Sequence, residues 1–387
     1  MSKKVRLGII GMGSEGSAYA GFISKGMVPN MVIGAISDVN PVFEANAKEL
    51  GVPFFADYKE MITSGTVDAV VTTVPHYLHP EMGIYALEHS VHALVEKPVG
   101  VYTKQAQRLI DVARKKPELQ FGVFFNQRTN PLYKDLRDLV ASGELGALRH
   151  TSWIITNWWR PQGYYDSSAW RATWGGEGGG VLVNQAPHQL DLWQWICGVP
   201  KSVFAKAQFG FRRDIAVEDE VNALVCFADG ATGSFMTSTH DFMGTDRLEI
   251  LFDSGKVVVE NSKDVTIWRL TKPEQEISKD MGLEDVVNLF RGQLDTSKFL
   301  SKETKSYTSV WGEQHSEVMR NFAAACLGEE ELLAPGAEGI HGVRLANAIH
   351  LSTWLGEEVS IENFDDQEYL DFLNIRIREE GKYQERD

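Results

Sequence analysis

Two short motifs near the start of the chain combine residues suited to hydride chemistry. The first is a glycine-rich turn after an apolar run, Gly11-Met12-Gly13-Ser14-Glu15-Gly16. Its glycines allow close approach of the backbone to a pyrophosphate, and the following helix offers N–H groups. The second, Glu96-Lys97-Pro98, ends the apolar run Val91–Val95, so Lys97 should face the reactive end of the same cofactor. Together they predict a nicotinamide-dependent oxidoreductase, although the turn alone also fits an ordinary strand–helix connection.

An acidic residue after the second expected strand bears on which nicotinamide cofactor binds. Asp38 lies in Ser37-Asp38-Val39, downstream of Gly16. A carboxylate there accepts hydrogen bonds from ribose hydroxyls and repels a 2′-phosphate, which favours NAD over NADP. The alternative is that Asp38 caps the helix expected to begin at Asn40-Pro41.

The loop after the fourth expected strand should also touch the cofactor. Pro75, His76 and His79 lie within Thr73–Pro80, and polar residues at the carboxyl end of a strand suit such a contact. The two histidines do not predict a metal site, because no carboxylate or cysteine cluster completes a ligand set. Packing or capping is the alternative for His79.

A third segment, Gly178–Trp193, joins three glycines to polar residues at helical spacing. Asn184, His188 and Asp191 are four and three residues apart, which predicts that they share one face of a helix. His188 would accept the proton of a substrate hydroxyl while the carbinol hydrogen leaves as hydride. The alternative is a buried histidine paired with a neighbouring carboxylate.

With these motifs the chain resembles the glucose–fructose oxidoreductase / inositol dehydrogenase (Gfo/Idh/MocA) family over nearly its whole length. The matching stretches are Gly11–Gly16, Val67–Pro75 with His79, Glu96-Lys97-Pro98, Asn126-Gln127-Arg128, Trp170-Arg171 and Gly178–Asp191. The resemblance implies a Rossmann domain, an α/β domain with an open antiparallel sheet, a homo-oligomer (dimer or tetramer), and Lys97 and His188 as the catalytic residues. The expected cofactor contacts are the glycine turn, Asp38, Pro75, His76, His79, Glu96, Lys97 and Asn126.

Position 184 departs from the pattern of the family, because this chain has asparagine where many members have aspartate. A missing carboxylate would remove a partner that orients His188, and Asp191 cannot be assumed to replace it. The version found here resembles a subgroup that acts on sugars and glycosides, including levoglucosan dehydrogenase and glycoside 3-dehydrogenases. That resemblance implies oxidation at the carbon corresponding to C3 of glucose.

The stretch Asn157–Trp174 is rich in aromatic residues and includes arginines. Sugar rings pack their C–H faces on aromatic rings while their hydroxyls need directional partners. The expected substrate contacts are Lys97, Arg128, Trp158, Arg160, Tyr165, Trp170, Arg171, Asn184 and His188. The alternative for any one of the aromatic residues is a core or an oligomer interface.

Composition narrows the class of protein. The chain has 387 residues, of which 43% are hydrophobic and 24% charged, as in folded two-domain proteins. A net charge of −15 argues against a nucleic-acid partner. Three cysteines without metal-like spacing, together with an N-terminus that lacks an apolar signal core, predict free thiols and a cytoplasmic location. No apolar stretch is long enough to predict a membrane span.

The elements that would position these residues alternate between strand and helix in the first part of the chain. The buried-strand candidates are Val5–Ile10, Met31–Ile36, Val52–Phe55, Val67–Val74, Val91–Val95 and Phe121–Phe125. This alternation predicts a doubly wound parallel sheet. Later strands joined by hairpin turns predict a second α+β domain with a mostly antiparallel sheet. We expect an NAD-binding domain at 1–125, a substrate and oligomerisation domain at 126–364 and a charged tail at 365–387, with 261–310 unassigned.

The sequence thus predicts an NAD-dependent dehydrogenase that reversibly oxidises a secondary hydroxyl of a sugar, glycoside or cyclitol. Within this class, a myo- or scyllo-inositol dehydrogenase is one alternative. An aldose–ketose oxidoreductase and a glycosidase that works by redox elimination, each with bound NAD, are others. A cofactor-binding regulator without turnover is the rival from a different class, against which the presence of both Lys97 and His188 weighs.

Overall fold

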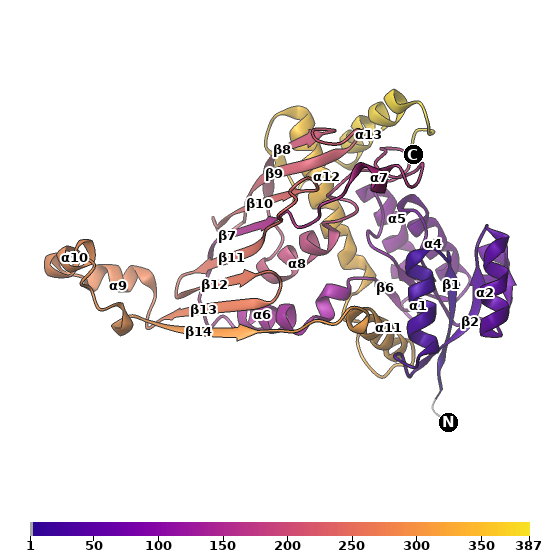
Figure 1. The fold of residues 1–387 in the computed structure, drawn as a ribbon, viewed down its shortest axis with the longest axis horizontal. Coiled ribbons are helices and arrows are strands. Elements are labelled where there is room, and N and C mark those ends of the chain that lie inside the picture. The colour runs from indigo at the N-terminus through magenta and orange to yellow at the C-terminus, as the bar shows by residue number, and fades with distance from the viewer. Residues whose placement is uncertain (1–2) are drawn as a thin grey trace.

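The computed structural model describes residues 3–387 and contains two β-sheets that lie side by side (Figure 1). The first sheet has six strands in the order β3-β2-β1-β4-β5-β6, and all of its neighbouring strands run parallel. Its strands are β1 (Val5–Ile10), β2 (Met31–Ser37), β3 (Phe54–Phe55), β4 (Ala69–Thr72), β5 (His92–Val95) and β6 (Phe121–Val123). The doubly wound parallel sheet predicted from the apolar runs is therefore confirmed. Its strand order reverses between β1 and β4, where such sheets bind ligands.

Helices connect the strands of this sheet, and their starts follow local sequence cues. They are α1 (Ser14–Ser24), α2 (Glu44–Leu50), α3 (Tyr58–Thr63), α4 (His79–Glu88) and α5 (Thr103–Arg114). The side chain of Asn40 accepts a hydrogen bond from Val42 N and caps the short turn before α2, and Asp57 caps α3 in the same way. β4 is buried along its whole length, as expected for a central strand covered on both faces.

The second sheet has nine strands in the order β14-β13-β12-β11-β7-β10-β9-β8-β15. All neighbouring pairs are antiparallel except β7 and β10, which are parallel, so the expected mostly antiparallel sheet is confirmed. Its central strands are β7 (Leu148–Ile155), β8 (Ser202–Phe209), β9 (Glu218–Cys226), β10 (Thr232–Ser238), β11 (Asp246–Phe252) and β12 (Gly255–Glu260), and β15 (Val359–Ser360) forms one edge.

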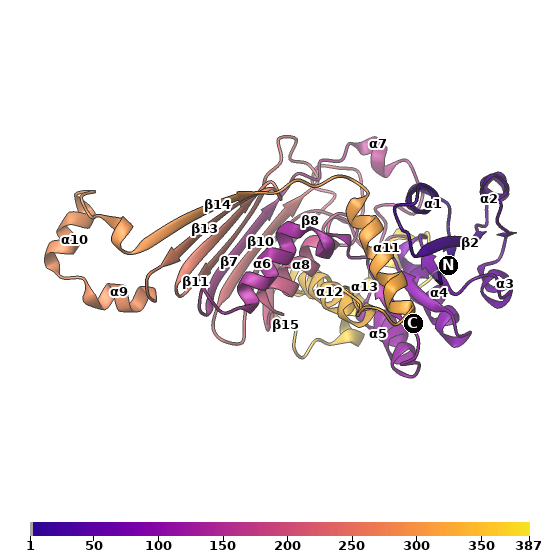
Figure 2. The same cartoon turned by 90° about the horizontal axis from the view of Figure 1, so that it is seen from below.

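Helices cover one face of the second sheet and connect it to the first. Figure 2 shows α6 (Pro131–Ala141), α8 (Pro187–Cys197) and α12 (Gly339–Leu355) along this face. Helix α12 packs against β8, α8 and α5, and thus contacts both halves of the molecule. No helix within residues 3–387 is long and apolar enough to cross a membrane.

The segment 261–310, left unassigned from the sequence, forms an arm that extends away from the body (Figure 1). β13 (Asp264–Leu270) leads out to α9 (Glu274–Asp280) and α10 (Leu283–Phe290), and β14 (Leu300–Ser306) returns antiparallel to β13. β14 is an edge strand with most of its residues exposed. Because burial does not alternate along it, the sequence has no strand periodicity there.

The C-terminal residues form a helix, α13 (Asp366–Glu380), and then return to the body. Its buried residues, Tyr369, Leu370, Leu373 and Ile377, recur at helical spacing. The last residue of α13, Glu380, binds the loop that contains Trp174 and Gly175, because both backbone N–H groups donate to its carboxylate, with 3.0 Å to Gly175. Nearby, the Arg386 guanidinium lies 4.0 Å from the centre of the Tyr77 ring.

Candidate active site

The glycine turn has the shape expected of a dinucleotide-binding turn. Gly11 has φ +93°, and a β-carbon there would collide with Thr73 O, while one on Gly16 would collide with Gly11 O. No atom of residues 3–387 lies within 4 Å of a β-carbon built on Gly13. Within the same range, no side chain caps the start of α1. Packing therefore requires glycine at two positions, and the third leaves open space beside the uncapped helix start, which fits a pyrophosphate.

Asp38 braces this turn. Its Oδ2 accepts a hydrogen bond from Met12 N at 2.7 Å, and its Oδ1 accepts one from Asn40 N at 2.8 Å. The capping alternative for Asp38 belongs instead to Asn40, whose own side chain makes the cap. The carboxylate is thus held at the carboxyl end of β2, beside the turn, with lone pairs remaining for further hydrogen bonds.

Lys97 links the end of β5 to the segment that precedes α8. Its Nζ donates to the backbone oxygen of Asn184 at 3.1 Å, and its backbone N–H donates to Glu96 Oε2, also at 3.1 Å. Glu96 is buried and accepts a hydrogen bond from the Tyr19 hydroxyl of α1. Burial raises the pKa of Glu96 to about 7, although the nearby charge of Lys97 opposes the shift. Two of the predicted motifs are therefore in direct contact.

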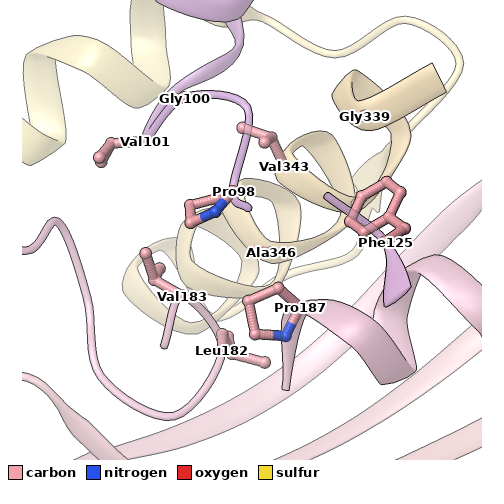
Figure 3. Close-up of a pocket in the computed structure, with 11 residues that line it drawn as sticks. Pro98, Gly100, Val101, Phe125, Leu182, Val183, Pro187, Gly339, Val343 and Ala346 are labelled. Carbon is pink, nitrogen blue, oxygen red and sulfur yellow. The ribbon is translucent and has the colours of Figure 1, made fainter. Parts of the chain in front are cut away.

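The residues behind this contact form an apolar cavity. Figure 3 shows the loop after β5, the segment before α8 and helix α12 converging on it. Its lining residues are Pro98, Gly100, Val101, Phe125, Leu182, Val183, Pro187, Gly339, Gly342, Val343 and Ala346. The apolar residues around this cavity hold the Lys97 motif and the segment before α8 relative to each other, and they contribute no polar side chains.

His188 is the second residue of α8 and is only partly exposed. Its Nδ1 is buried and has no hydrogen-bond partner in the part of the chain that the structure describes. Burial, assisted by the charges of Lys97 and His315, holds the pKa of His188 well below its usual range. The imidazole is therefore neutral at physiological pH, which is the form that a proton acceptor must have.

One prediction for this segment is wrong. Asn184 does not lie on a helix with His188 and Asp191, because α8 begins only at Pro187. Proline suits the first position of a helix, and the preceding residues turn back, with Asn184 N donating to Gly180 O. Asp191 does lie on α8, but its carboxylate binds Arg128 rather than His188.

Arg128, an expected substrate contact, is 2% exposed. Its Nε and Nη2 donate to the two oxygens of Asp191 at 2.9 and 2.7 Å, and its Nη1 donates to Glu338. The guanidinium also lies 5.2 Å from the Trp195 ring. All three nitrogens thus have partners inside the protein, so this geometry gives no support to the expected substrate contact.

The two histidines after β4 have separate partners. His79 lies between two carbonyl oxygens, each 2.8 Å from a ring nitrogen, those of Val74 and Pro98. Burial lowers its pKa to about 4. His76 has its Nδ1 3.3 Å from the backbone oxygen of Glu177 and its ring edge against Trp170. The end of β4, with Pro75 at its turn, is thereby tied to both the Lys97 loop and the aromatic stretch.

Asn126 contacts a residue that the sequence did not single out. Its Nδ2 lies 3.0 Å from Nε2 of His315, on α11 (Glu313–Cys326). Burial and the charge of Lys97 lower the pKa of His315 to about 4. The ring of Trp311, which is 70% exposed, lies 5.8 Å from that of His315. No motif surrounds His315, so only the folded chain reveals its position.

The aromatic stretch divides into inward and site-facing residues. Tyr165 is buried and donates to Thr239 Oγ1 at 2.9 Å, and Trp158 packs against the core of the second sheet. Around Tyr164, in contrast, two arginines gather. The guanidinium groups of Arg160 and Arg171 lie 5.2 and 4.6 Å from the centre of the Tyr164 ring.

We call Tyr164, Arg160, Arg171 and Trp170 the Tyr164 group. This group connects through Asn184 to the contact between Lys97 and the Asn184 backbone oxygen. Arg171 Nη1 donates to the Tyr164 hydroxyl at 2.8 Å and also lies against the Trp170 ring. The hydroxyl lies 3.4 Å from Asn184 Oδ1. The structure thus brings together Lys97, Asn184 and Arg171, with Trp170 and His76 beside them. It leaves Arg128 and Tyr165 buried, with their polar groups paired inside the protein, and Trp158 partly buried against the core of the second sheet.

Comparisons with known proteins agree with this architecture. The model described as "Oxidoreductase family, NAD-binding Rossmann fold" matches residues 5–125, and the GFO/IDH/MocA C-terminal domain matches residues 133–258. An uncharacterised oxidoreductase, YrbE of Bacillus subtilis, is 27% identical over 94% of this chain and 98% of its own. Myo-inositol 2-dehydrogenase of Thermotoga maritima is 28% identical over 68% of this chain and 77% of its own.

Solved structures share the fold over almost the whole chain. The WlbA dehydrogenase of Chromobacterium violaceum, in complex with NADH and UDP-GlcNAcA, superposes with a TM-score of 0.77 at 24% identity, covering 93% of this chain and 96% of that one. Levoglucosan dehydrogenase in complex with NADH and levoglucosan gives 0.76 at 20% identity, with 93% and 100% covered. The matched family models, together with the glycine turn and the two-sheet architecture, establish that this chain is an NAD-binding oxidoreductase of the Gfo/Idh/MocA family.

Proposed function

We propose that this enzyme reversibly oxidises a secondary hydroxyl of a sugar, glycoside or cyclitol, with Lys97 and His188 as its acid–base residues. The observation that carries the proposal is the position of Lys97 Nζ, 3.1 Å from Asn184 O, with a neutral His188 four residues further along the same segment. Lys97 follows the carboxyl end of β5, and His188 lies on α8, one of the helices that cover the second sheet.

The two residues divide the work of proton transfer. A lysine ammonium has three N–H donors, of which one binds Asn184 O, so the others remain for the substrate oxygen. During oxidation the C–H bond breaks with both electrons leaving as hydride, the O–H proton passes to His188 and a C=O bond forms. NAD supplies the hydride acceptor when bound. The residues proposed to hold it are Gly11 to Gly16, Asp38, Pro75, His76, Lys97 and Asn126. His79 and Glu96, which we expected from the sequence to touch it, are buried with their polar atoms engaged inside the protein and would position this set.

The substrate class rests on the Tyr164 group and on the relatives. The Arg160 and Arg171 guanidiniums lie over the Tyr164 ring, and Arg171 also lies over the Trp170 ring. Their N–H groups and the Tyr164 hydroxyl offer the directional hydrogen-bond partners that the hydroxyls of a sugar or cyclitol require. Levoglucosan dehydrogenase, with its sugar ligand, favours a glycoside, and C3 is our preferred carbon. The inositol dehydrogenases among the relatives favour a cyclitol as the second candidate.

A panel of free sugars, glycosides and inositols, assayed with NAD at the nicotinamide absorbance, tests the proposal. Turnover of a ring polyol, with NMR of the product to identify the oxidised carbon, is the expected result. Efficient turnover of short aliphatic alcohols alone would reject the substrate class. NAD binding without turnover of any compound would favour the regulator.

We also propose that the enzyme is a homo-oligomer, a dimer or a tetramer. The face of the second sheet opposite its helices exposes apolar side chains, Leu224 by 61% and Phe204 by 48%, with Ile154 and Leu251 on neighbouring strands. Phe204 and Leu224 face each other across β8 and β9, and exposed apolar side chains that lie together in this way mark interaction sites. Light scattering coupled to size exclusion should give a multiple of the 43.2 kDa chain mass. A monomer would contradict the proposal.

A further inference from the structure

Glu177 is a buried carboxylate that the acid–base scheme leaves without a role. It directly precedes the three glycines Gly178–Gly180 and is 2% exposed. The nearest guanidinium nitrogen with which it pairs, Nη1 of Arg171, is 4.0 Å away. A carboxylate is costly to bury unless charge or hydrogen bonds stabilise it, so its contacts call for a physical reason.

The Glu177 carboxylate is held by donors on both oxygens. Oε2 accepts a hydrogen bond from Ala172 N at 2.6 Å, and Oε1 accepts one from the Asn184 side-chain amide. The backbone oxygen of Glu177 faces His76 Nδ1. Glu177 therefore joins the end of β4 to Asn184, the residue whose backbone oxygen binds Lys97.

Asn184 has both ends of its amide engaged. Its Nδ2 donates to Glu177, and its Oδ1 accepts from Gln185 Nε2 at 3.1 Å, with the Tyr164 hydroxyl at 3.4 Å. An aspartate at position 184 would place two carboxylates in contact, and like charges at that separation force one of them to take up a proton. Asparagine at 184 and glutamate at 177 therefore form a complementary pair. In this pair the negative charge belongs to Glu177, which contacts Asn184, and not to residue 184, whose backbone oxygen binds Lys97.

We propose that Glu177 is a positioning residue for hydride transfer. It holds the Asn184 amide and thereby fixes the backbone oxygen that orients the Lys97 ammonium, and it supplies the negative charge that position 184 lacks. The inference rests on the proposed function, because it assigns a role within the same reaction.

The ionised form of Glu177 is the form that matches its surroundings. Both oxygens face donors, so a proton on either oxygen would replace an acceptor with a donor. Burial raises the pKa of Glu177 to about 7, Glu218 adds to the increase, and the Ala172 and Asn184 hydrogen bonds and Arg171 oppose it. Two further groups lie beside this segment: His76, with its Nδ1 at the backbone oxygen of Glu177, and His350, whose ring lies next to Gly179 and pairs with the buried Glu218.

This titration gives the reaction a recognisable pH dependence. As pH falls through about 7, Glu177 takes up a proton and loses its match to Asn184, so kcat should fall. His188 titrates well below its usual range and does not account for a change at this pH. Glu96 has a pKa in the same region, so the shape of the pH profile separates the two carboxyls, whatever the basal kcat of each variant. The fall in kcat near pH 7 should persist in Glu96→Gln and disappear in Glu177→Gln.

The central experiment exchanges the charges of the pair. Glu177→Gln keeps the shape of the side chain but places an amide against the donors of Ala172 and Asn184. We expect kcat to fall by about 10- to 100-fold, as for a small misplacement of a catalytic group, while the Kd for NAD changes less than about twofold. The fall in kcat near pH 7 should also disappear. Adding Asn184→Asp to Glu177→Gln restores one carboxylate to the pair, and part of the lost kcat should return, whereas Asn184→Asp alone should be impaired.

Each outcome decides the inference. A kcat of Glu177→Gln within twofold of the wild-type kcat would overturn the role of Glu177. A pH profile that is the same in Glu177→Gln as in the wild type would do so as well. Failure of the double variant to recover any activity would reduce Glu177 to a packing residue. If Glu177→Gln does not fold, Asn184→Asp alone decides, since normal kcat in that variant contradicts the pairing.

Failure of the proposed function is distinguishable from failure of this inference. If the wild type turns over no ring polyol, the ionisation of Glu177 can still be followed by its carboxyl band in infrared difference spectra against Glu177→Gln. A carboxyl that titrates near 7 and shifts in Asn184→Asp would uphold the pairing. A band that titrates in the ordinary range of glutamate, unaltered by Asn184→Asp, would reject it.

Discussion

Replacing Arg128 with methionine should lower the free energy of unfolding of the protein without altering how the protein binds its substrate. The substitution removes two hydrogen bonds to Asp191 and the contact with Glu338, and leaves the Asp191 carboxylate buried without its countercharge. Breaking a buried ion pair in this way costs about 3–5 kcal/mol of unfolding free energy. The matched control is Arg247→Met, whose ion pairs with Glu249 and Glu260 are partly exposed and should contribute at most about 1 kcal/mol.

The loss of unfolding free energy caused by Arg128→Met should grow as pH rises. Burial already raises the pKa of Asp191 and the Arg128 charge opposes that effect, so removing the guanidinium raises the pKa further. The folded variant then binds a proton that the unfolded chain releases, and unfolding free energy falls with increasing pH. Complete uptake of one proton corresponds to about 1.4 kcal/mol per pH unit. The Arg247→Met control should show no such slope.

Thermal and urea unfolding, followed by circular dichroism at several pH values, measure the loss of unfolding free energy and its pH dependence. Steady-state kinetics measure substrate binding through KM. The KM for the ring polyol should stay within about threefold of wild type, because every nitrogen of Arg128 already has a partner inside the protein. Normal stability combined with a KM raised tenfold or more would refute this reasoning and restore Arg128 as a substrate contact.

Three further predictions concern the cofactor and the acid–base residues. Lys97→Met and His188→Ala should each lower kcat by about 10²–10⁴-fold while NAD still binds by fluorescence titration, and near-normal turnover would contradict their roles. Asp38→Ser should weaken NAD use and improve NADP use relative to it, as measured by kcat/KM for the two cofactors; a wild type that already prefers NADP would show the assignment to be wrong. Gly13→Ala should fold normally but bind NAD more weakly, whereas Gly16→Ala should lower the unfolding midpoint, because only the second β-carbon meets backbone; equal unfolding midpoints would contradict this difference.

The sequence predicts those parts of the fold in which burial alone decides the order of apolar and polar residues. The strands of the parallel sheet are covered on both faces, and runs such as that of β4 are therefore apolar throughout. The edge strand β14 has little buried surface, so nothing in its sequence distinguishes it from a loop. The spacing of Asn184, His188 and Asp191 suggested one helix, but Pro187, which begins α8, was the better guide to where the helix starts.

The candidate site was predictable where a motif concentrates it within a few residues. The glycine turn and the Lys97 motif belong to this kind. His315 reaches the site only because α11 folds towards it, and no local pattern surrounds it. Tyr164 belongs to the aromatic stretch that the sequence singles out, but its contacts with Arg171 and Asn184 exist only in the folded chain. Glu177 stood beside three conspicuous glycines, yet its burial, which makes it chemically unusual, exists only in the folded chain.

The hold of Glu380 on the loop at Trp174 and Gly175 has a consequence for the order in which the molecule forms. The two partners are more than 200 residues apart, with a separation of 206 for Trp174 and Glu380. During synthesis both sheets leave the ribosome before Glu380 does, and contacts between such distant residues form late because a long loop must close first. The loop that carries Glu177 should therefore acquire its final conformation only after the rest of the body has folded. Nascent chains would pass through a stage with a complete cofactor-binding sheet and an incomplete substrate side.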